Sequence, residues 1–215
     1  MISLYHKYKN ILLFLSDKQY RNYKLVDKEL SDKEFVDNII KNEYIKITCK
    51  DKSDNTIYCY LLPNNSKYLE IEYVTKLFNS LNKESTYGTK VIMITKYDLN
   101  KHIKKNYVNY NNLTIYNFPH KYFIVPINKG PLCAKYRILS KDEAEELLNN
   151  LMKINRYELR KIRVDDPQMI WIDANVGDIV ECEDISFYSA FSCKYELVIF
   201  DPATLIDIKQ STETD

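Results

Sequence analysis

Few side chains in this sequence have the types and spacing that nucleophilic or acid–base chemistry requires. The three histidines, His6, His102 and His120, are scattered, and no Cys or Ser stands in a nucleophile motif beside them. No G-x-x-x-x-G-K-[ST] segment is present, and three Gly in 215 residues are too few for a phosphate-cradling loop system. The sequence therefore predicts a chain that is not an enzyme and takes no cofactor.

A cluster of four acidic residues close together in the sequence is a candidate metal or catalytic site. Asp142, Glu143, Glu145 and Glu146 follow closely on Ser140. Acidic residues are also favoured near the positive N-terminal end of a helix, and Ser140 with Glu143 forms a capping box. The helix-capping interpretation is preferred, and no metal site is predicted.

A basic run with interleaved aromatics is the candidate nucleic-acid contact. Its members are Lys96, Lys101, Lys104 and Lys105, with Tyr107 and Tyr110 among them. Lysine contacts to phosphate combined with aromatic stacking are typical of single-strand binders. A basic, solvated helix face is the alternative. The formal net charge of +1 excludes a generally basic nucleic-acid binder, so any such contact must be local.

The five cysteines and the hydropathy pattern indicate the compartment. Five is an odd number, and none of these residues forms a C-x-x-C pair, so reduced intracellular thiols are expected. No stretch is expected to be a membrane span or a signal peptide, because the apolar run Ile11–Leu15 is too short.

The elements that must position these residues form two halves. In the first half, helices are expected along three apolar stripes: Tyr8, Leu12 and Leu15; Phe35, Val36, Ile39 and Ile40 behind a capping box from Ser31 to Glu34; and Val74, Leu77, Phe78 and Leu81. Strands are expected at 56–62, 90–95, 113–118 and 122–126, the second of them covered on both faces. This order predicts a sheet with helices packed on it.

The second half begins after a break at Gly130-Pro131. A helix is expected behind the Ser140–Glu143 capping box, with the stripe Ala144, Leu147, Leu148 and Leu151. The segments 178–184 and 194–200 are expected to form an antiparallel pair, followed by a polar tail.

The order of motifs in the second half resembles RNA polymerase subunit five, which the eukaryotic nuclear polymerases share and which has a counterpart without the jaw domain in archaea. The motifs are "ILS-KDEAEELL", "ELRKI", "DDP", "VGDIV" and "KYELV". The positions that match the family pattern are Leu132, Lys135, Leu139, Ser140, Glu143, Leu147, Leu148, Leu159, Ile162, Asp166, Pro167, Gly177, Asp178, Val180, Ser186 and Tyr195. The first half resembles the N-terminal jaw domain of that family more loosely.

The chain departs from the family pattern at several positions. Where the family has Pro and His, this chain has Ala134 and Tyr136, and Arg160-Lys161 replaces Pro-Arg. Two family arginines are replaced by Asp184 and Glu196. The jaw turn T-P-S-A, which lies beside downstream DNA in the family, is replaced by "DLNK" at 98–101. Such drift, with AT-rich coding, indicates a divergent member from a large DNA virus.

The resemblance implies an α+β chain with an N-terminal α/β jaw domain of nuclease-like topology at 1–129. A small mixed α/β C-terminal assembly domain would follow at 130–200, with a polar tail at 201–215. The chain would be a non-catalytic subunit that anchors to the largest polymerase subunit near subunit six. Its jaw would lie beside downstream duplex DNA, contacted weakly through the four lysines named above. The compartment would be a cytoplasmic viral factory or the virion if the source is viral, and otherwise the nucleus.

Two alternatives belong to other classes. The chain could be a free-standing nucleic-acid-binding module that uses the basic run, or a degenerate nuclease-like domain. Against the second, Glu70 and Glu72 lack the Lys at the step that a metal-dependent nuclease needs.

The stretch from Asp165 to Val180 is the expected centre of the assembly surface. Asp166-Pro167 predicts a rigid turn in which Asp166 can bond the following backbone. Gly177 predicts a tight turn that needs positive φ or close backbone approach. Trp171 is either a partner contact or a core residue. The residues expected to bind partners are Lys135, Tyr136, Asp166, Pro167, Trp171, Gly177, Asp178, Ser186 and Tyr195.

Overall fold

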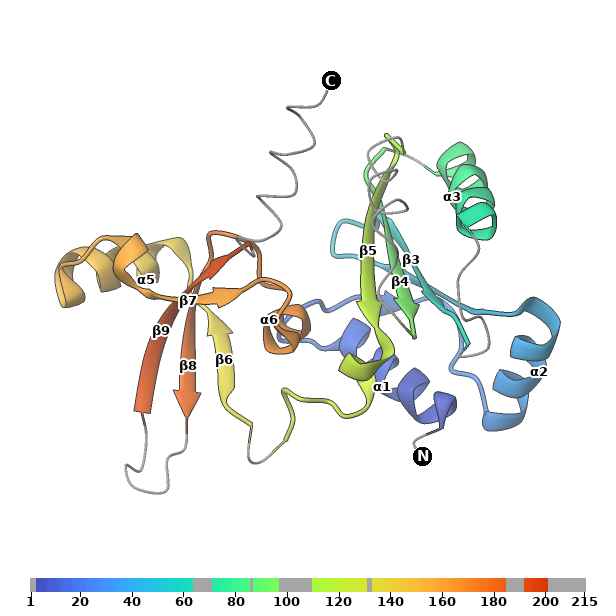
Figure 1. The fold of residues 1–215 in the computed structure, drawn as a ribbon, viewed down its shortest axis with the longest axis horizontal. Helices are drawn as coiled ribbons and strands as arrows, with labels where there is room; N and C mark the ends of the chain where they lie inside the picture. The colour runs from blue at the N-terminus through green and yellow to red at the C-terminus, as the bar shows by residue number, and fades with distance from the viewer. Residues whose placement is uncertain are drawn as a thin grey trace. The chain divides into compact units, whose positions relative to one another are not determined.

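The computed structural model is an α+β chain that divides into two compact units (Figure 1). They are the N-terminal unit, Met1–Pro126, and the C-terminal unit, Ile127–Asp215. The structure describes residues 3–63, 71–85, 87–96, 110–130, 133–184 and 192–200, without the side chains of 71–74, 84 and 184. No helix within these ranges is long and apolar enough to cross a membrane.

The N-terminal unit is built on a mixed five-stranded sheet in the order β1-β2-β3-β4-β5. The pairs β1–β2 and β2–β3 are antiparallel, whereas β3–β4 and β4–β5 are parallel. Its elements are α1 (Leu4–Ser16), β1 (Lys24–Leu25), α2 (Asp32–Asn42), β2 (Ile45–Lys50), β3 (Thr56–Leu61), α3 (Ile71–Glu84), β4 (Thr89–Thr95), β5 (Leu113–Pro119) and the 3₁₀ helix η2 (His120–Phe123).

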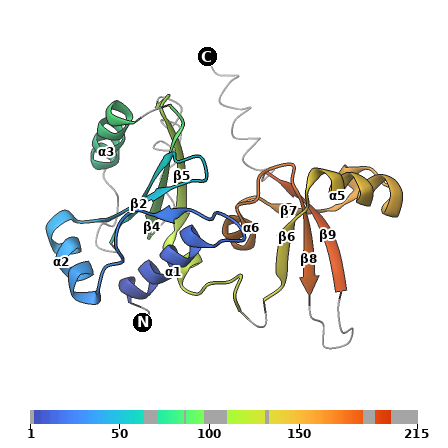
Figure 2. The ribbon, with the colours of Figure 1, turned by 180° about the vertical axis from the view of Figure 1, so that it is seen from behind.

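Helices α1 and α3 cover opposite faces of this sheet (Figures 1 and 2). On one face, Phe78 of α3 packs in a cluster with Val91 and Met93 of β4. On the other face, the ring of Phe14 in α1 lies edge-on to that of Phe118, which is in register with Ile94. The prediction that 90–95 is a strand covered on both faces is therefore confirmed.

One predicted strand is wrong. Of the segment 122–126, the first two residues belong to the 3₁₀ helix η2 and the other three form no strand. Contacts with α1 stabilise it there, because Asn10 Nδ2 donates to the carbonyl oxygens of Phe123 and Ile124, each at 3.0 Å. The ring of Phe123 also packs against Phe14. The apolar composition that predicted a strand is used for burial against a helix.

Helix α2 begins at the predicted capping box, but its predicted apolar stripe is only partly buried. Phe35 packs against Tyr5 and Tyr8 of α1, with ring centroids 5.3 and 5.2 Å apart. Val36 and Ile40 are exposed, at 47% and 76%. The helix contacts the rest of the unit along a narrower face than its sequence indicates.

The C-terminal unit is built on a mixed four-stranded sheet in the order β6-β8-β9-β7. The pairs β6–β8 and β8–β9 are antiparallel and β7–β9 is parallel, so the antiparallel pairing of 178–184 with 194–200 is confirmed. Its elements are β6 (Lys135–Ile138), α5 (Lys141–Glu146), the π-helix η3 (Leu147–Met152), the 3₁₀ helix η4 (Arg156–Glu158), β7 (Arg160–Arg163), α6 (Pro167–Ile172), β8 (Ile179–Asp184) and β9 (Ser192–Ile199).

One face of this sheet packs against α5 and η3. Leu147 and Leu159 form a buried cluster there with Ile179 of β8 and Leu197 of β9. Helix α5 begins at the predicted Ser140–Glu143 capping box. Strand β6 and helix α6 were not predicted. From the sequence, the β6 segment is interpreted as part of a break between the two halves and the α6 segment as a turn followed by apolar residues. Each element is only a few residues long, which leaves too little pattern to predict it.

Candidate functional site

The Asp166-Pro167 pair begins helix α6. The carboxylate of Asp166 accepts a hydrogen bond from the backbone N–H of Gln168 at 2.8 Å, and Pro167 occupies the first helical position. At that position the missing N–H of Pro costs nothing and its fixed φ suits the helix. The helix ends at Asp173 in the left-handed conformation, with φ 62°. The predicted side-chain bond to the following backbone is present, but it caps a helix.

Gly177 and Asp178 join the loop after α6 to strand β9. Gly177 has φ +96°, as predicted, and its N–H donates to the carbonyl of Val198 at 2.9 Å. The N–H of Val198 donates to the carbonyl of Asp178 at 2.9 Å, and the Asp178 carboxylate accepts from the N–H of Asn175 at 2.7 Å. A Cβ on Gly177 would meet only Arg156 Nη2, at 3.8 Å. Strain from a substitution would therefore come from φ and not from crowding.

Trp171 is a core residue. Its side chain is 0% exposed, as is that of Met169, and Ile170 and Ile172 are also buried. The alternative of a core role is thus the one that the structure supports. A direct partner contact by Trp171 would require its side chain to leave the core.

The remaining predicted partner-binding residues do not form one patch. Lys135 and Tyr195 lie on the same sheet face as the Arg137–Glu181 pair, because cross-strand partners share a face. Tyr136 lies on the opposite face, where Asp166 is one of the charges that, after burial, raise its pKa. Ser186 lies outside the described residues.

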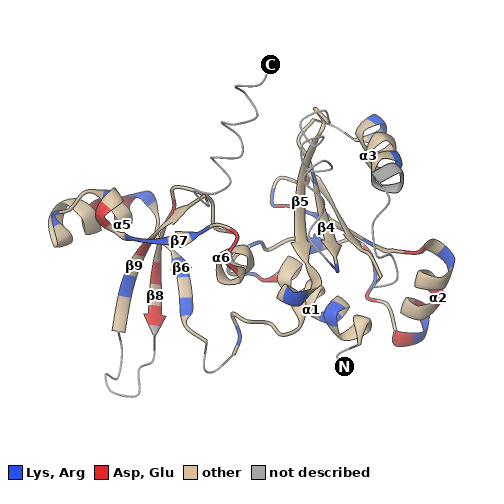
Figure 3. Ribbon diagram, viewed as in Figure 1, with Lys and Arg blue, Asp and Glu red and all other residues tan. Residues whose placement is uncertain are grey.

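Strands β6 and β8 are tied to α5 by a charged network on the face that carries Tyr195. Figure 3 marks the acidic and basic positions along these strands. Arg137 donates to Glu181 at 2.8 Å and to Glu143 at 2.6 Å, and the Tyr195 hydroxyl donates to Glu181 at 3.2 Å. Hydrogen bonds from the Ser140 N–H and then Arg137 lower the pKa of Glu143 to about 2. Glu143 thus serves both the capping box and this network.

Three departures from the family pattern meet on the other face. Glu196 is 5% exposed, and Arg160 Nε lies 3.0 Å from its carboxylate. The Tyr136 hydroxyl donates to the same carboxylate at 3.5 Å, a long contact. A buried carboxylate requires such partners. The acidic residue at 196 is therefore accommodated inside the chain by the replacements at 136 and 160, a relation that sequence reading missed because the three positions are far apart in the chain.

Lys96 is the described member of the predicted nucleic-acid set; Lys101, Lys104 and Lys105 lie outside the described residues. It directly follows β4, and its neighbour Thr95 pairs in register with Pro119, next to His120. Burial and the charge of Lys96 lower the pKa of Lys7 on α1. Burial, with the charges of Lys7 and Lys96, lowers the pKa of His120 to about 4. Lys7 thus adds a basic side chain that sequence reasoning did not find.

The part of the chain that the structure describes contains no group of three or more His, Cys, Asp or Glu side chains that could hold a metal ion. The five cysteines are free thiols, and Cys49, Cys59 and Cys182 are buried.

Comparisons with known proteins match both units. Residues 125–198 match the family model described as RNA polymerase Rpb5, C-terminal domain. The DNA-directed RNA polymerase subunit Rpo5 of Archaeoglobus fulgidus is 43% identical over 68 residues, which cover 32% of this chain and 88% of that protein. This chain belongs to the RNA polymerase subunit five family.

Viral members of the subunit five family match more of the chain. The DNA-directed RNA polymerase RPB5 homolog of African swine fever virus is 22% identical over 173 residues, or 77% of this chain and 83% of that protein. This supports the prediction of a divergent viral member. A solved structure described as "Structure of EndoMS in apo form" shares 14% identity over 53% of this chain and 46% of that chain, with a TM-score of 0.33, too low to inform the fold.

Proposed function

We propose that this subunit five is a non-catalytic part of its polymerase and attaches to the largest subunit through its C-terminal unit, near subunit six. The observation behind the proposal is that the family match at residues 125–198 falls, apart from its first two residues, in the C-terminal unit. As a family member, the chain is a component of a multisubunit DNA-directed RNA polymerase.

The capped turns around α6 support an attachment role. Gly177 is exposed, and Val176 beside it is 42% exposed, while the hydrogen bonds to Val198 hold their loop against β9. A loop held in this way loses little conformational freedom on binding. Lys135, exposed on β6 and paired with Glu183 at the end of β8 away from this loop, is a second, separate proposed contact.

The N-terminal unit would form part of the lower jaw around downstream duplex DNA. Lys96 and Lys7 support this role, since they bring two lysines to the carboxyl end of β4. Lys101, Lys104 and Lys105 follow in the sequence. Contact with DNA would be weak in the free subunit, because few phosphates are neutralised. By its viral relatives, the complex would work in a cytoplasmic viral factory or in the virion.

Purification of the tagged full-length chain from its source tests the attachment. Mass spectrometry should find two very large chains in near-equal amounts with it. Lys135→Glu should reduce their yield, whereas Lys41→Glu on exposed α2 should not. Recovery without large chains, or tight and salt-resistant duplex binding by the free subunit, would favour an independent nucleic-acid module instead.

A further inference from the structure

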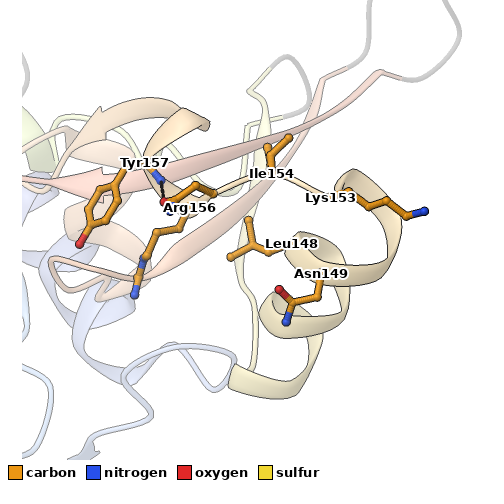
Figure 4. Close-up of a pocket in the computed structure, with 7 residues that line it drawn as sticks. Leu148, Asn149, Lys153, Ile154, Arg156 and Tyr157 are labelled. Carbon is orange, nitrogen blue, oxygen red and sulfur yellow. Dashed lines mark hydrogen bonds between the residues drawn. The ribbon is translucent and has the colours of Figure 1, made fainter.

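An open groove of about 540 Å³ lies beside the C-terminal end of η3 (Figure 4). None of the residues that line it is among those proposed above for assembly or DNA contact. The residues that line it are Leu148, Asn149, Lys153, Ile154, Asn155, Arg156 and Tyr157.

The groove has a well-defined backbone frame. The segment Leu147–Met152 is a π-helix, a rare conformation that is frequent at functional sites. Lys153 ends it in the left-handed conformation, with φ 53°, and its N–H donates to the carbonyl of Leu148. Asn155 then caps η4, as its side chain accepts from the N–H of Tyr157 at 3.0 Å. Its own N–H donates to Glu158 at 3.2 Å.

Apolar groups form the floor and one rim of the groove. Leu148 and Ile154 pack on the core cluster of the unit and present their remaining surface to the groove. Tyr157 is 71% exposed. Leu151 and Met152, on the adjoining turn of η3, are 71% and 43% exposed. Several large apolar side chains gathered at one surface are typical of an interaction site.

The charge of the lining is positive. Lys153 and Arg156 are the charged members among the seven lining residues named above, and none of the seven carries a carboxylate side chain. Arg156 Nη2 donates to the carbonyl of Gly177, which fixes the guanidinium. In Figure 4, Arg156 and Tyr157 extend at one end and Lys153 projects from the other, with Leu148 between them. An occupant would thus meet an apolar centre between two cations.

We propose that this groove docks a short acidic segment of a partner protein, with a large apolar side chain on Leu148 and Ile154 and carboxylates toward Lys153 and Arg156. Arginine and aromatic residues, here Arg156 and Tyr157 at one end of the groove, are enriched in binding hot spots. Nucleic acid fits less well, because two cations neutralise few phosphates and the apolar floor would have no partner.

The test uses the full-length chain and a fluorescent synthetic decapeptide with Leu-Phe at its centre and Asp or Glu at the other positions. The variant is Lys153→Glu with Tyr157→Ser, two changes at exposed side chains. The matched control is Lys83→Glu with Tyr87→Ser, which changes the same residue types at the same spacing, also at exposed positions, in the N-terminal unit. Fluorescence anisotropy measures affinity, and Trp171 emission on heating checks folding. Lys153→Glu alone replaces the double variant if that unfolds.

The groove variant should bind the peptide about tenfold more weakly, equivalent to about 1.4 kcal/mol, while the control binds as the native chain does. Equal affinity of all three proteins would overturn the proposal. So would equal binding of a peptide with Lys in place of its acidic residues, or loss of binding to a DNA duplex and not to the peptide. Tighter peptide binding by Leu205→Ser with Ile206→Ser would show that the chain's own tail is the occupant, again overturning it.

Discussion

The sheets of the two units differ in the charged residues that their strands carry. In the N-terminal sheet, strands β3 and β5 contain no charged residue and the other three contain lysines but no acidic residue: Lys24, Lys46, Lys50 and Lys90. In the C-terminal sheet, ion pairs lie on both faces: Arg137 with Glu181 on one and Arg160 with Glu196 on the other. The family model matches in the second region, at 125–198.

This difference offers a reason why family motifs are easier to recognise in the sequence of the second half than in that of the first. An apolar core accepts many apolar replacements of similar volume, so strand and helix patterns persist while residue identities drift. Caps, positive-φ glycines and paired charges accept few replacements, because each depends on one chemical group in one place. The experiments below separate the two kinds of stabilisation, starting with the largest expected effect.

Strain at matched glycines should separate the units most clearly. Gly177→Val with Pro167→Ala should destabilise the C-terminal unit by about 1–3 kcal/mol, since Val is strained at φ +96°. The variant should fail to enter the polymerase. Trp171, the sole Trp, reports this unit during thermal unfolding.

The counterpart in the N-terminal unit is Gly88→Val, at φ +81° with open space around the new side chain. It should leave the Trp171 transition in place and lower the stability seen by Tyr emission. Wild-type co-purification of the Gly177 and Pro167 variant with the large subunits would refute the attachment role of this region.

Acid should destabilise the N-terminal unit through His120. Burial lowers its folded pKa from the ordinary 6.5 to about 4, so the unfolded state binds the proton more tightly. The contribution is fully present above pH 6.5 and is lost as pH falls toward 4, and it amounts to roughly 3 kcal/mol. His120→Gln should flatten the dependence of denaturation midpoints over that range. A slope equal to that of the native chain would exclude His120 as its source.

The pair of exposed Arg160 with buried Glu196 in the C-terminal sheet should show a coupled effect. Arg160→Ala leaves Glu196 buried with the long Tyr136 contact, at a cost of about 1–2 kcal/mol. The double change Arg160→Ala with Glu196→Gln should recover part of the loss, because the unpaired charge is removed. A double-mutant cycle from urea denaturation gives the coupling energy, and additive changes would show that the pair is not coupled.

The basic run should give the smallest effect. Changing Lys101, Lys104 and Lys105 to Ala should leave assembly intact and modestly lower the salt resistance of the elongation complex. Sequence preference should not change, as phosphate contacts carry no base information. Lys7→Ala should add to the effect if the jaw surface extends to α1. If the elongation complexes of the native chain and the triple variant have identical half-lives at every salt concentration, the basic run is a solvated face that does not contact DNA.

Local chemistry in the sequence determined much of the C-terminal unit. The Ser140–Glu143 capping box, the positive φ of Gly177 and the pairing of 178–184 with 194–200 all follow from short-range rules, and the structure confirms them. The same rules located α1, β3, β4 and β5 in the N-terminal unit. These features depend on neighbouring residues, so the chain order suffices to predict them.

Tertiary structure alone decided the features that join distant segments. The segment 122–126 has strand composition, yet Asn10 and Phe14 of α1 stabilise its start as a 3₁₀ turn. The burial of Trp171, the meeting of Arg160 with Glu196, and the approach of Lys7 to Lys96 have no local signature. Each depends on contacts between residues far apart in the chain, which only packing brings together.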